Sequence, residues 1–263
     1  MKASTRLDEA VAERAGVTRS RARSLIIAGR VRVDGRPATK AGAHVPFGAE
    51  LEVERPRPFV SRGGEKLEGA LLDFGLGVGG LRALDVGAST GGFTDCLLQL
   101  GAAEVVALDV GYGQLALALR DDPRVTVVER TNFRLLPDGA LGAPFDVITI
   151  DASFISVVTL IDRARAFGAR DGAIVALVKP QFEAGRARLG PGGVVRDSAV
   201  HRAILGEVRA AVAALGVVPV ALSASRLRGP AGNVEFFMLV RTSGAAYDDA
   251  AIERVLERVA GAA

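Results

Sequence analysis

Lysine is rare in this chain, and two of its lysines stand beside the richest motifs. Of the 33 basic residues only four are lysines, namely Lys2, Lys40, Lys66 and Lys179. Lys66 precedes a glycine-rich segment at 83–94, and Lys179 ends an apolar run at 173–179. An ammonium group can lose its proton when it is desolvated or placed beside like charge, whereas a guanidinium cannot. Lysine at these two points therefore favours proton chemistry over a need for charge alone, with four lysines scattered by chance as the alternative.

Two carboxylates complete a candidate network with these lysines. Asp151 ends an apolar run at 145–151, and Glu235 lies at the start of a run at 234–242. Two amines and two carboxylates at strand ends or flanking loops are suited to removing or directing the proton of a sugar hydroxyl. The alternative is a pair of surface salt bridges, which contribute little free energy.

The segment DVGASTGGFT (85–94) is a candidate cofactor loop. It follows a predicted strand and opens a predicted helix, and its glycines let a cofactor lie against bare backbone. The pair Gly91-Gly92 replaces the last single glycine of the dinucleotide fingerprint, which disfavours an NAD-linked oxidoreductase. Asp109, at the end of the next apolar run, is placed to accept hydrogen bonds from ribose hydroxyls. Together they indicate an adenosine-containing cofactor, with a tight turn that merely packs helix on strand as the alternative.

The elements that would position these groups alternate from Leu81 onward. Apolar strand-like runs lie at 81–87, 103–111, 124–130, 145–151 and 173–179, with helical periodicity at 94–101 and 155–168. Such alternation predicts a doubly wound α/β domain whose ligand lies beyond the carboxyl ends of the strands. The runs at 217–225 and 234–242 have no long helix between them, which predicts an antiparallel pair at the sheet edge.

The first quarter of the chain has a different pattern. Two short helices are expected at 6–16 and 20–29, ended by Gly16 and Gly29, with Ser20 as the cap of the second. A hairpin at 30–37 turns at Asp34-Gly35, and a strand follows at 49–54. This predicts a small α+β domain over 1–54, a proline-interrupted linker at 55–60 and a large domain over 61–263.

Charge and composition narrow the class of protein. Residues 1–66 hold 14 basic and 8 acidic side chains, a net +6, which suggests a module for a polyanion on a mildly acidic remainder. Cys96 is the only cysteine, and we expect it to be a small core residue that makes no internal disulfide. The first residues lack a secretory pattern, and the longest apolar run, 210–222, is too short to span a bilayer. We therefore expect a cytoplasmic protein that does not insert into membranes.

Several segments resemble one family over essentially the full length. They are RGGEKL (62–67), DVGASTGGFTD (85–95), TIDASFIS (149–156), LVKPQFEAGR (177–186), GGVVRD (192–197) and RGPAGNVEFF (228–237). These strings are similar to the TlyA, or haemolysin-A-like, ribosomal RNA 2′-O-ribose methyltransferases, which belong to the wider FtsJ-type group. The Lys-Asp-Lys-Glu tetrad of that group falls on Lys66, Asp151, Lys179 and Glu235. The resemblance implies that Lys179 acts on the ribose hydroxyl while the other three orient or tune it.

The same resemblance implies S-adenosylmethionine as the cofactor and no metal. Its binding residues would come from the glycine loop, from Asp109 on the ribose, and from Asn132 and Asp151; within the loop they are Gly87, Ser89, Thr90, Gly91, Gly92 and Phe93. Gly91 and Phe93 would lie along the methionine part and Asn132 near the adenine. Many relatives in the wider group carry aspartate where this chain has Asn132.

Residues 6–54 separately resemble the RNA-binding domain named after ribosomal protein S4. The matching strings are RLD (6–8), SRARSLI (20–26), GRVRVDG (29–35) and VPFGAELEV (45–53), together with Lys40. The resemblance implies phosphate contacts from Arg6, Arg19, Arg21 and Arg23, which position an RNA more than they specify its sequence.

The resemblance to this family implies methylation of a cytidine 2′-hydroxyl in ribosomal RNA of the small subunit, the large subunit or both. The expected partner is ribosomal RNA within ribosomal subunits, and the oligomeric state is left open. One alternative is a non-catalytic RNA-binding or ribosome-assembly factor. A membrane-active haemolysin is a further alternative, disfavoured by the lack of a signal, a spanning segment or a strongly amphipathic cationic helix.

Overall fold

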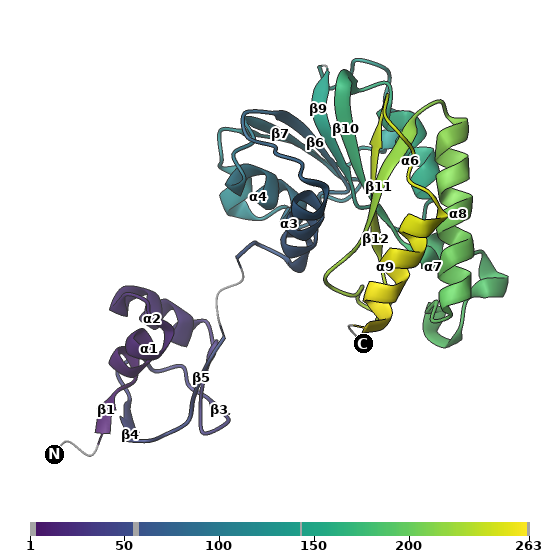
Figure 1. Ribbon diagram of the computed structural model, residues 1–263. Helices are drawn as coiled ribbons and strands as arrows, with labels where there is room; N and C mark the ends of the chain where they lie inside the picture. The colour runs from purple at the N-terminus through teal and green to yellow at the C-terminus, as the bar shows by residue number, and fades with distance from the viewer. Residues whose placement is uncertain (1–3, 55–57, 143, 262–263) are drawn as a thin grey trace. The chain divides into compact units, whose positions relative to one another are not determined.

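The computed structural model describes residues 4–54, 58–142 and 144–261. The chain divides into two compact units, residues 1–57 and 58–263, which we call the N-terminal and C-terminal units (Figure 1). Of the linker expected at 55–60, residues 55–57 lie outside the described residues. Each unit is described by itself.

The N-terminal unit packs two helices against short strands. Its helices are α1 (Leu7–Ala15) and α2 (Arg19–Ile27). One sheet pairs β1 (Ser4–Arg6) with β4 (His44–Pro46), and the other has the order β3 (Arg36–Pro37), β2 (Val31–Val33) and β5 (Leu51–Val53). The core is small and apolar, and consists of Leu7, Val11, Ala22, Leu25, Ile26, Val31 and Val45. The predicted α+β arrangement is confirmed.

Local signals of the N-terminal unit are mostly confirmed. The hairpin turns at Asp34 and Gly35, both with positive φ, as a tight two-residue turn requires. Gly16 ends α1 in the left-handed conformation. The prediction that Ser20 caps α2 is wrong. Thr18 has the extended backbone of a cap, and its Oγ1 accepts a hydrogen bond from the backbone N–H of Arg21, so the helix begins before Ser20.

The C-terminal unit is built on one seven-stranded sheet of order β11-β12-β10-β9-β6-β7-β8. Five strands run parallel, namely β6 (Arg82–Val86), β7 (Glu104–Leu108), β8 (Val125–Val128), β9 (Phe145–Ile150) and β10 (Gly168–Val178). β12 (Phe236–Arg241) is antiparallel to both of its neighbours, β10 and the edge strand β11 (Val218–Ala224). The doubly wound sheet and its antiparallel edge pair are therefore confirmed.

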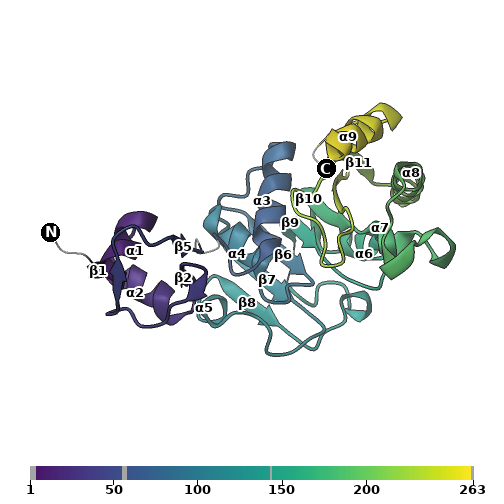
Figure 2. The same ribbon diagram turned by 90° about the horizontal axis from the view of Figure 1, so that it is seen from below.

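Helices cover both faces of this sheet (Figures 1 and 2). α3 (Arg62–Phe74), α4 (Gly92–Gln99) and the short α5 (Leu117–Arg120) share a buried apolar cluster with one face. α6 (Val157–Ala164), α8 (Ser198–Ala214) and α9 (Asp249–Gly261) share another cluster with the opposite face. Short helical turns α7 (Pro180–Glu183), η1 (Phe133–Leu135), η2 (Arg186–Arg188) and η3 (Pro191–Gly193) lie in the connections. Alternate residues of each strand enter the two clusters, which explains the continuous apolar runs of the sequence.

The strand order reverses between β6 and β9. From β6 the chain moves to β7 and β8 on one side, and it then returns to β9 and β10 on the other. In open α/β sheets the crevice at the carboxyl ends of two such strands is the usual place for a ligand. The residues that follow β6 and β9 are Gly87 and Asp151, both of which are predicted site residues.

Candidate active site

Lys66 and Glu235 form a buried ion pair beside the sheet. Lys66 lies in α3, and Glu235 immediately precedes β12. The Lys66 Nζ donates a hydrogen bond of 2.6 Å to Oε2 of Glu235, and the two side chains are only 9% and 2% exposed. A side chain at Gly229 would clash with the other carboxylate oxygen of Glu235. The pair is therefore enclosed, unlike a surface salt bridge.

Lys179 and Asp151 form a second pair at the rim of the sheet. Lys179 follows β10 directly, and its Nζ lies 2.5 Å from Oδ1 of Asp151, with side-chain exposures of 11% and 25%. Nζ also donates a hydrogen bond of 3.3 Å to Oγ of Ser153. Among the described residues, the buried Oδ1 of Asp151 has no well-aligned hydrogen-bond donor. We therefore treat this short contact as a charge pair whose orientation is not fixed by a hydrogen bond.

Strand register brings the two pairs to one edge. Val178 of β10 pairs with Phe236 of β12, so the next residues outward on these neighbouring strands are Lys179 and Glu235. On the other side of β10, Ile150 of β9 pairs with Ala176, which places Asp151 just beyond the end of β9. All four predicted tetrad residues thus gather at the carboxyl edge of the parallel strands as two ion pairs.

The loop between β6 and α4 lies against the same edge. Gly87 has a φ of 87°, and a side chain there would clash with the backbone carbonyl oxygen of Asp151. Gly91 has a φ of 95° at the start of α4, and a side chain at Gly92 would clash with Oγ of Ser61. Glycine at these three positions lets the loop turn left-handed at Gly87 and Gly91 and lets it approach the Asp151 backbone and the Ser61 side chain closely.

Other predicted cofactor residues divide into exposed and buried groups. Ser89 and Thr90 are exposed at the tip of the loop. The ring of Phe93 is buried and packs against Phe237 at 6.0 Å between ring centroids. The Phe93 side chain therefore packs in the core of the C-terminal unit, and its expected place along the methionine part of the cofactor stays a prediction.

Asp109 is held in place by backbone donors. Its Oδ2 accepts a hydrogen bond of 2.8 Å from the Ser89 N–H, and its Oδ1 accepts one of 2.6 Å from the Gly111 N–H. The Arg130 N–H donates a hydrogen bond to the carbonyl oxygen of Gly111, and Asn132 lies two residues further along the chain. The Oδ1 of Asn132 caps η1 by accepting a hydrogen bond from the Arg134 N–H. Asp109 therefore lies beside the glycine loop, and its carboxylate is oriented by two backbone donors.

Asp85 lies near the end of β6, at the first position of the segment that the sequence indicates as a cofactor loop. It is fully buried, and its two oxygens accept hydrogen bonds from Oγ1 of Thr94 at 2.7 Å and of Thr149 at 3.0 Å. Burial raises the pKa of Asp85 to about 6, the threonine hydroxyls oppose the rise, and the charge of Asp151 adds to it. No pattern in the sequence indicates that this carboxyl points into the core.

We predict that Asp85→Asn alters the pH dependence of stability. A carboxyl whose pKa is raised in the folded state stabilises the fold below its unfolded pKa, near 4, and this contribution is lost as pH rises through about 6. A shift of about 2 units corresponds to roughly 3 kcal/mol at neutral pH. Urea unfolding at pH 4.5 and 7.5 should therefore show that the variant gains free energy of unfolding relative to the wild type at the higher pH. Equal differences at both pH values would contradict this assignment.

Two phenylalanines beside Lys179 escaped the sequence prediction. Phe154 is 90% exposed and adopts a left-handed backbone with a φ of 65°. Its ring centroid lies 5.1 Å from that of Phe182, over which the Lys179 Nζ lies at 5.9 Å. No pattern in the sequence distinguishes these rings from core phenylalanines. The pair forms an aromatic surface next to the candidate catalytic amine.

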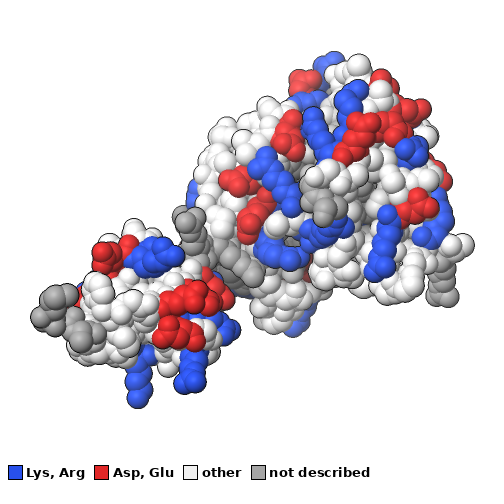
Figure 3. Space-filling view, turned by 60° about the horizontal axis from the view of Figure 1, so that its bottom comes forward, with Lys and Arg blue, Asp and Glu red and all other residues white. Residues whose placement is uncertain are grey.

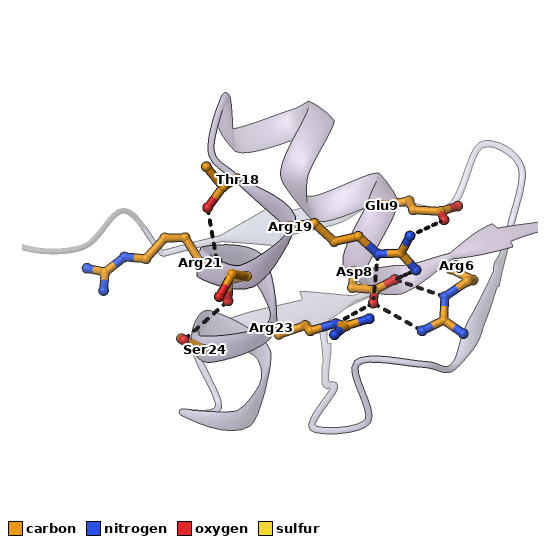
Figure 4. Close-up of polar contacts among 9 residues, drawn as sticks. Arg6, Asp8, Glu9, Thr18, Arg19, Arg21, Arg23 and Ser24 are labelled. Atoms are coloured by element: carbon orange, nitrogen blue, oxygen red, sulfur yellow. Dashed lines mark hydrogen bonds and ion pairs between the residues drawn. The ribbon is translucent and has the colours of Figure 1, made fainter.

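The five predicted RNA-binding residues separate into a cluster of three arginines and two residues outside it, Arg21 and Lys40. Arg6, Arg19 and Arg23 all contact the buried carboxylate of Asp8 (Figure 4). The Arg21 side chain points away from Asp8 in the same view, and Lys40 is exposed in the loop before β4. The structure therefore brings three of the five residues together.

The remaining residues of interest have structural surroundings. Cys96 is buried and free, as expected of a core residue. His201 is buried with its ring edge against Phe236, and burial lowers its pKa. The described residues contain no group of three or more His, Cys, Asp or Glu side chains arranged to hold a metal ion. Within the described ranges, none of the helices combines the length and apolar character that crossing a bilayer requires.

Comparison with known proteins identifies the family. Residues 59–242 match the FtsJ-like methyltransferase family, and residues 5–51 match the S4 domain. The chain is 51% identical over 234 residues to the 16S/23S rRNA (cytidine-2′-O)-methyltransferase TlyA of Mycobacterium tuberculosis, with 87% of each chain covered. It is 39% identical to Hemolysin A of Brachyspira hyodysenteriae, over 88% of this chain and 97% of that protein.

A solved structure agrees with these sequence matches. A protein of Streptococcus thermophilus, provisionally assigned as a hemolysin, is 36% identical and superposes with a TM-score of 0.76 over 99% of this chain and 97% of its own. The chain therefore belongs to the TlyA, or haemolysin-A-like, family of FtsJ-like methyltransferases with an N-terminal S4 domain, and it is an enzyme.

Proposed function

We propose that this enzyme transfers the methyl group of S-adenosylmethionine to the 2′-hydroxyl of a cytidine in ribosomal RNA. The observation that carries the proposal is the position of the Lys179 amine. It lies 2.5 Å from Asp151, at the edge of the sheet formed by the carboxyl ends of β9 and β10. The 51% identity to an rRNA (cytidine-2′-O)-methyltransferase supports the choice of acceptor. In this proposal residues 1–54 bind RNA, and residues 61–263 carry the transfer.

The residues around the β6–α4 loop fit S-adenosylmethionine. Gly87, Gly91 and Gly92 let the loop pack closely against Asp151, Leu119 and Ser61, so the loop would present a fixed backbone to a ligand. The carboxylate of Asp109, oriented by two backbone N–H groups, would hold the ribose hydroxyls. Ser89 and Thr90, exposed at the loop tip, and Asn132, for the adenine, would complete the site. When bound, this cofactor supplies an electrophilic methyl group on a sulfonium.

The tetrad would align the acceptor hydroxyl and handle one proton. Lys179 is the group proposed to meet the ribose oxygen, where its amine receives or directs the hydroxyl proton. Asp151 holds this amine from one side, and the buried Lys66–Glu235 pair fixes the adjacent end of β12. Alignment of the two reacting atoms supplies much of the acceleration in such a transfer.

The aromatic pair beside Lys179 would receive the base of the target nucleotide. Exposed aromatic rings stack on unpaired bases in RNA recognition, and Phe154 and Phe182 offer such a surface. We predict that Phe154→Ala lowers kcat/KM for the RNA about tenfold, because stacking contributes roughly 1–3 kcal/mol per base. Cofactor binding should be unchanged, and Phe154→Tyr should retain activity because it keeps the ring. Equal losses in the two variants would argue against stacking.

The function is tested with labelled S-adenosylmethionine and separately purified small and large ribosomal subunits. We expect label in ribosomal RNA, mapped to the 2′-oxygen of a cytidine in one subunit or in both. A synthetic cytidine homopolymer is the control for non-specific transfer, and it should remain unlabelled. Specific binding to subunits without any incorporation would support a non-catalytic assembly factor instead.

A further inference from the structure

Asp8 lies at the centre of the arginine cluster of the N-terminal unit (Figure 4). It belongs to the first turn of α1, and its side chain is 0% exposed. Arg6 donates to both oxygens through Nε and Nη2 at 3.1 Å, and Arg23 donates to Oδ2 through Nε at 2.9 Å. Arg19 donates to Oδ1 through Nη2 at 3.3 Å. One carboxylate thus accepts hydrogen bonds from three guanidinium groups.

The three arginines cover this carboxylate and remain partly exposed themselves. Their side chains are 37%, 44% and 52% exposed for Arg6, Arg19 and Arg23. A guanidinium has five N–H donors, and Arg23 uses only Nε on Asp8, so its two Nη groups are left for another acceptor. The arginines therefore keep N–H donors on their exposed sides, while their contacts with Asp8 hold the guanidinium groups in place.

Three separate chain segments meet in the cluster. Arg6 ends β1, whereas Arg19 and Arg23 stand four residues apart on one face of α2. The guanidinium of Arg6 also lies against Gly42, where a side-chain carbon would be 3.4 Å from Nη2. The spacing of the guanidinium groups thus follows from the packing of α1 and α2 against the loop before β4.

The cluster keeps a positive charge. Three arginines and one aspartate leave a net charge of +2, and Glu9 pairs with Nη1 of Arg19 at 2.8 Å. The Arg6 guanidinium first, and then Arg23 and Arg19, hold the pKa of Asp8 well below its usual range, so the carboxylate remains ionised at neutral pH. Figure 3 shows Lys and Arg interspersed with Asp and Glu on the drawn face. Because the charges on this face are mixed, an anion would be bound by a cluster of arginines in a fixed geometry rather than by a diffuse positive field.

We propose that Asp8 is a positioning residue that fixes Arg6, Arg19 and Arg23 as a preformed site for the phosphates of folded RNA. The proposal rests on the proposed function, in which the N-terminal unit binds ribosomal RNA. Guanidinium forks match phosphate oxygens, and holding the forks beforehand reduces the conformational entropy lost on binding. Asp8 itself does not contact the RNA.

Charge and positioning predict opposite effects when Asp8 loses its charge. Asp8→Asn removes one negative charge near the phosphates, so electrostatics alone predicts tighter binding. Positioning predicts weaker binding, because the guanidinium groups lose their common acceptor. Glu9→Gln is the matched control, since it removes the same charge from the same helix but frees only one contact of one arginine.

The test measures the Kd of the full-length protein for purified ribosomal subunits over a series of salt concentrations. For Asp8→Asn we expect Kd to rise by about tenfold and the slope of log K against log salt to become shallower by about 1. Glu9→Gln should bind as well as the wild type or more tightly. Tighter binding by both variants would overturn the proposal.

A second pair of variants decides the matter if Asp8→Asn fails to fold in thermal unfolding. Arg23→Lys keeps the charge but removes the guanidinium, whose separate N–H groups can donate to Asp8 and to a phosphate at the same time. We therefore expect it to weaken binding severalfold. Arg14→Lys, at an exposed position in the last turn of α1, should bind as the wild type does. Wild-type affinity for both lysine variants would reject a role for fork geometry.

Failure of this inference can be told from failure of the proposed function. A wild-type protein that neither binds nor methylates ribosomal subunits would remove the proposed function itself. A wild-type protein that does both, with Asp8→Asn indistinguishable from Glu9→Gln, would remove only the role of Asp8.

Discussion

Replacing Lys179 with alanine is expected to lower the rate of methyl transfer by about 10²–10⁴-fold, the usual contribution of a positioned acid–base group. The amine lies 2.5 Å from Asp151 and the Lys179 side chain is only 11% exposed, so bulk water cannot readily take its place. The affinities for S-adenosylmethionine and for the RNA should change little. Single-turnover rates with labelled cofactor, measured beside the two dissociation constants, separate these effects.

Lys179→Arg distinguishes proton handling from charge. A guanidinium keeps its proton in proteins, so the arginine variant should be as slow as the alanine variant. Ser153→Ala is the local control, because it removes the 3.3 Å hydrogen bond to the amine and leaves the amine itself. Turnover by Lys179→Arg at the wild-type rate would remove the proton-handling role of Lys179.

Truncating Lys66 should cause the largest loss of stability among these variants. Lys66→Ala leaves Glu235, which is 2% exposed, as an unpaired buried charge. Removing one partner of a buried pair typically costs roughly 3–5 kcal/mol of unfolding free energy. Urea denaturation of the wild type and of the variant measures this loss directly.

A double variant separates the stability of the pair from its function. Lys66→Met with Glu235→Leu replaces both charges by apolar groups of similar size, and such replacements are often neutral or stabilising. We therefore expect the double variant to recover most of the unfolding free energy but to stay deficient in methyl transfer. Recovery of both stability and activity would make the pair a purely structural feature.

The sequence predicted the fold well because its signals are repetitive and local. Buried parallel strands are apolar on both faces, so each run, such as 103–111 around β7, is visible without knowledge of its neighbours. The run at 173–179 is shorter than the strand to which it belongs. β10 begins at Gly168, and its register with β9 is irregular between Gly168 and Ala173. This irregular stretch contains glycines at 168 and 172 and lacks the apolar run by which the rest of the strand was predicted.

The location of the candidate site could be predicted from the sequence, but not which of its side chains contact each other. Charged residues that follow parallel strands must meet at one edge, so Asp109, Asp151 and Lys179 were predictable. Which lysine pairs with which carboxylate depends on the strand order and on the packing of α3, which lies far from Glu235 in sequence.

The burial of Cys96 was predicted, but the burial or exposure of several charged and aromatic side chains was not. Asp8 and Asp85 are carboxylates in ordinary sequence surroundings, yet one is covered by arginines and the other by two threonines and the core. Phe154 is apolar by type, yet it is exposed because its left-handed backbone turns it out of the loop. Such features follow from tertiary contacts rather than from local pattern.

The most direct test is a structure of the enzyme with S-adenosylhomocysteine and an RNA fragment that contains the methylated cytidine. We predict that the Lys179 Nζ lies about 2.6–3.2 Å from the ribose 2′-oxygen, within hydrogen-bond reach, with Asp151 on its other side. A ribose oxygen met by a different side chain, with the Lys179 amine turned away from the acceptor, would contradict the proposed mechanism.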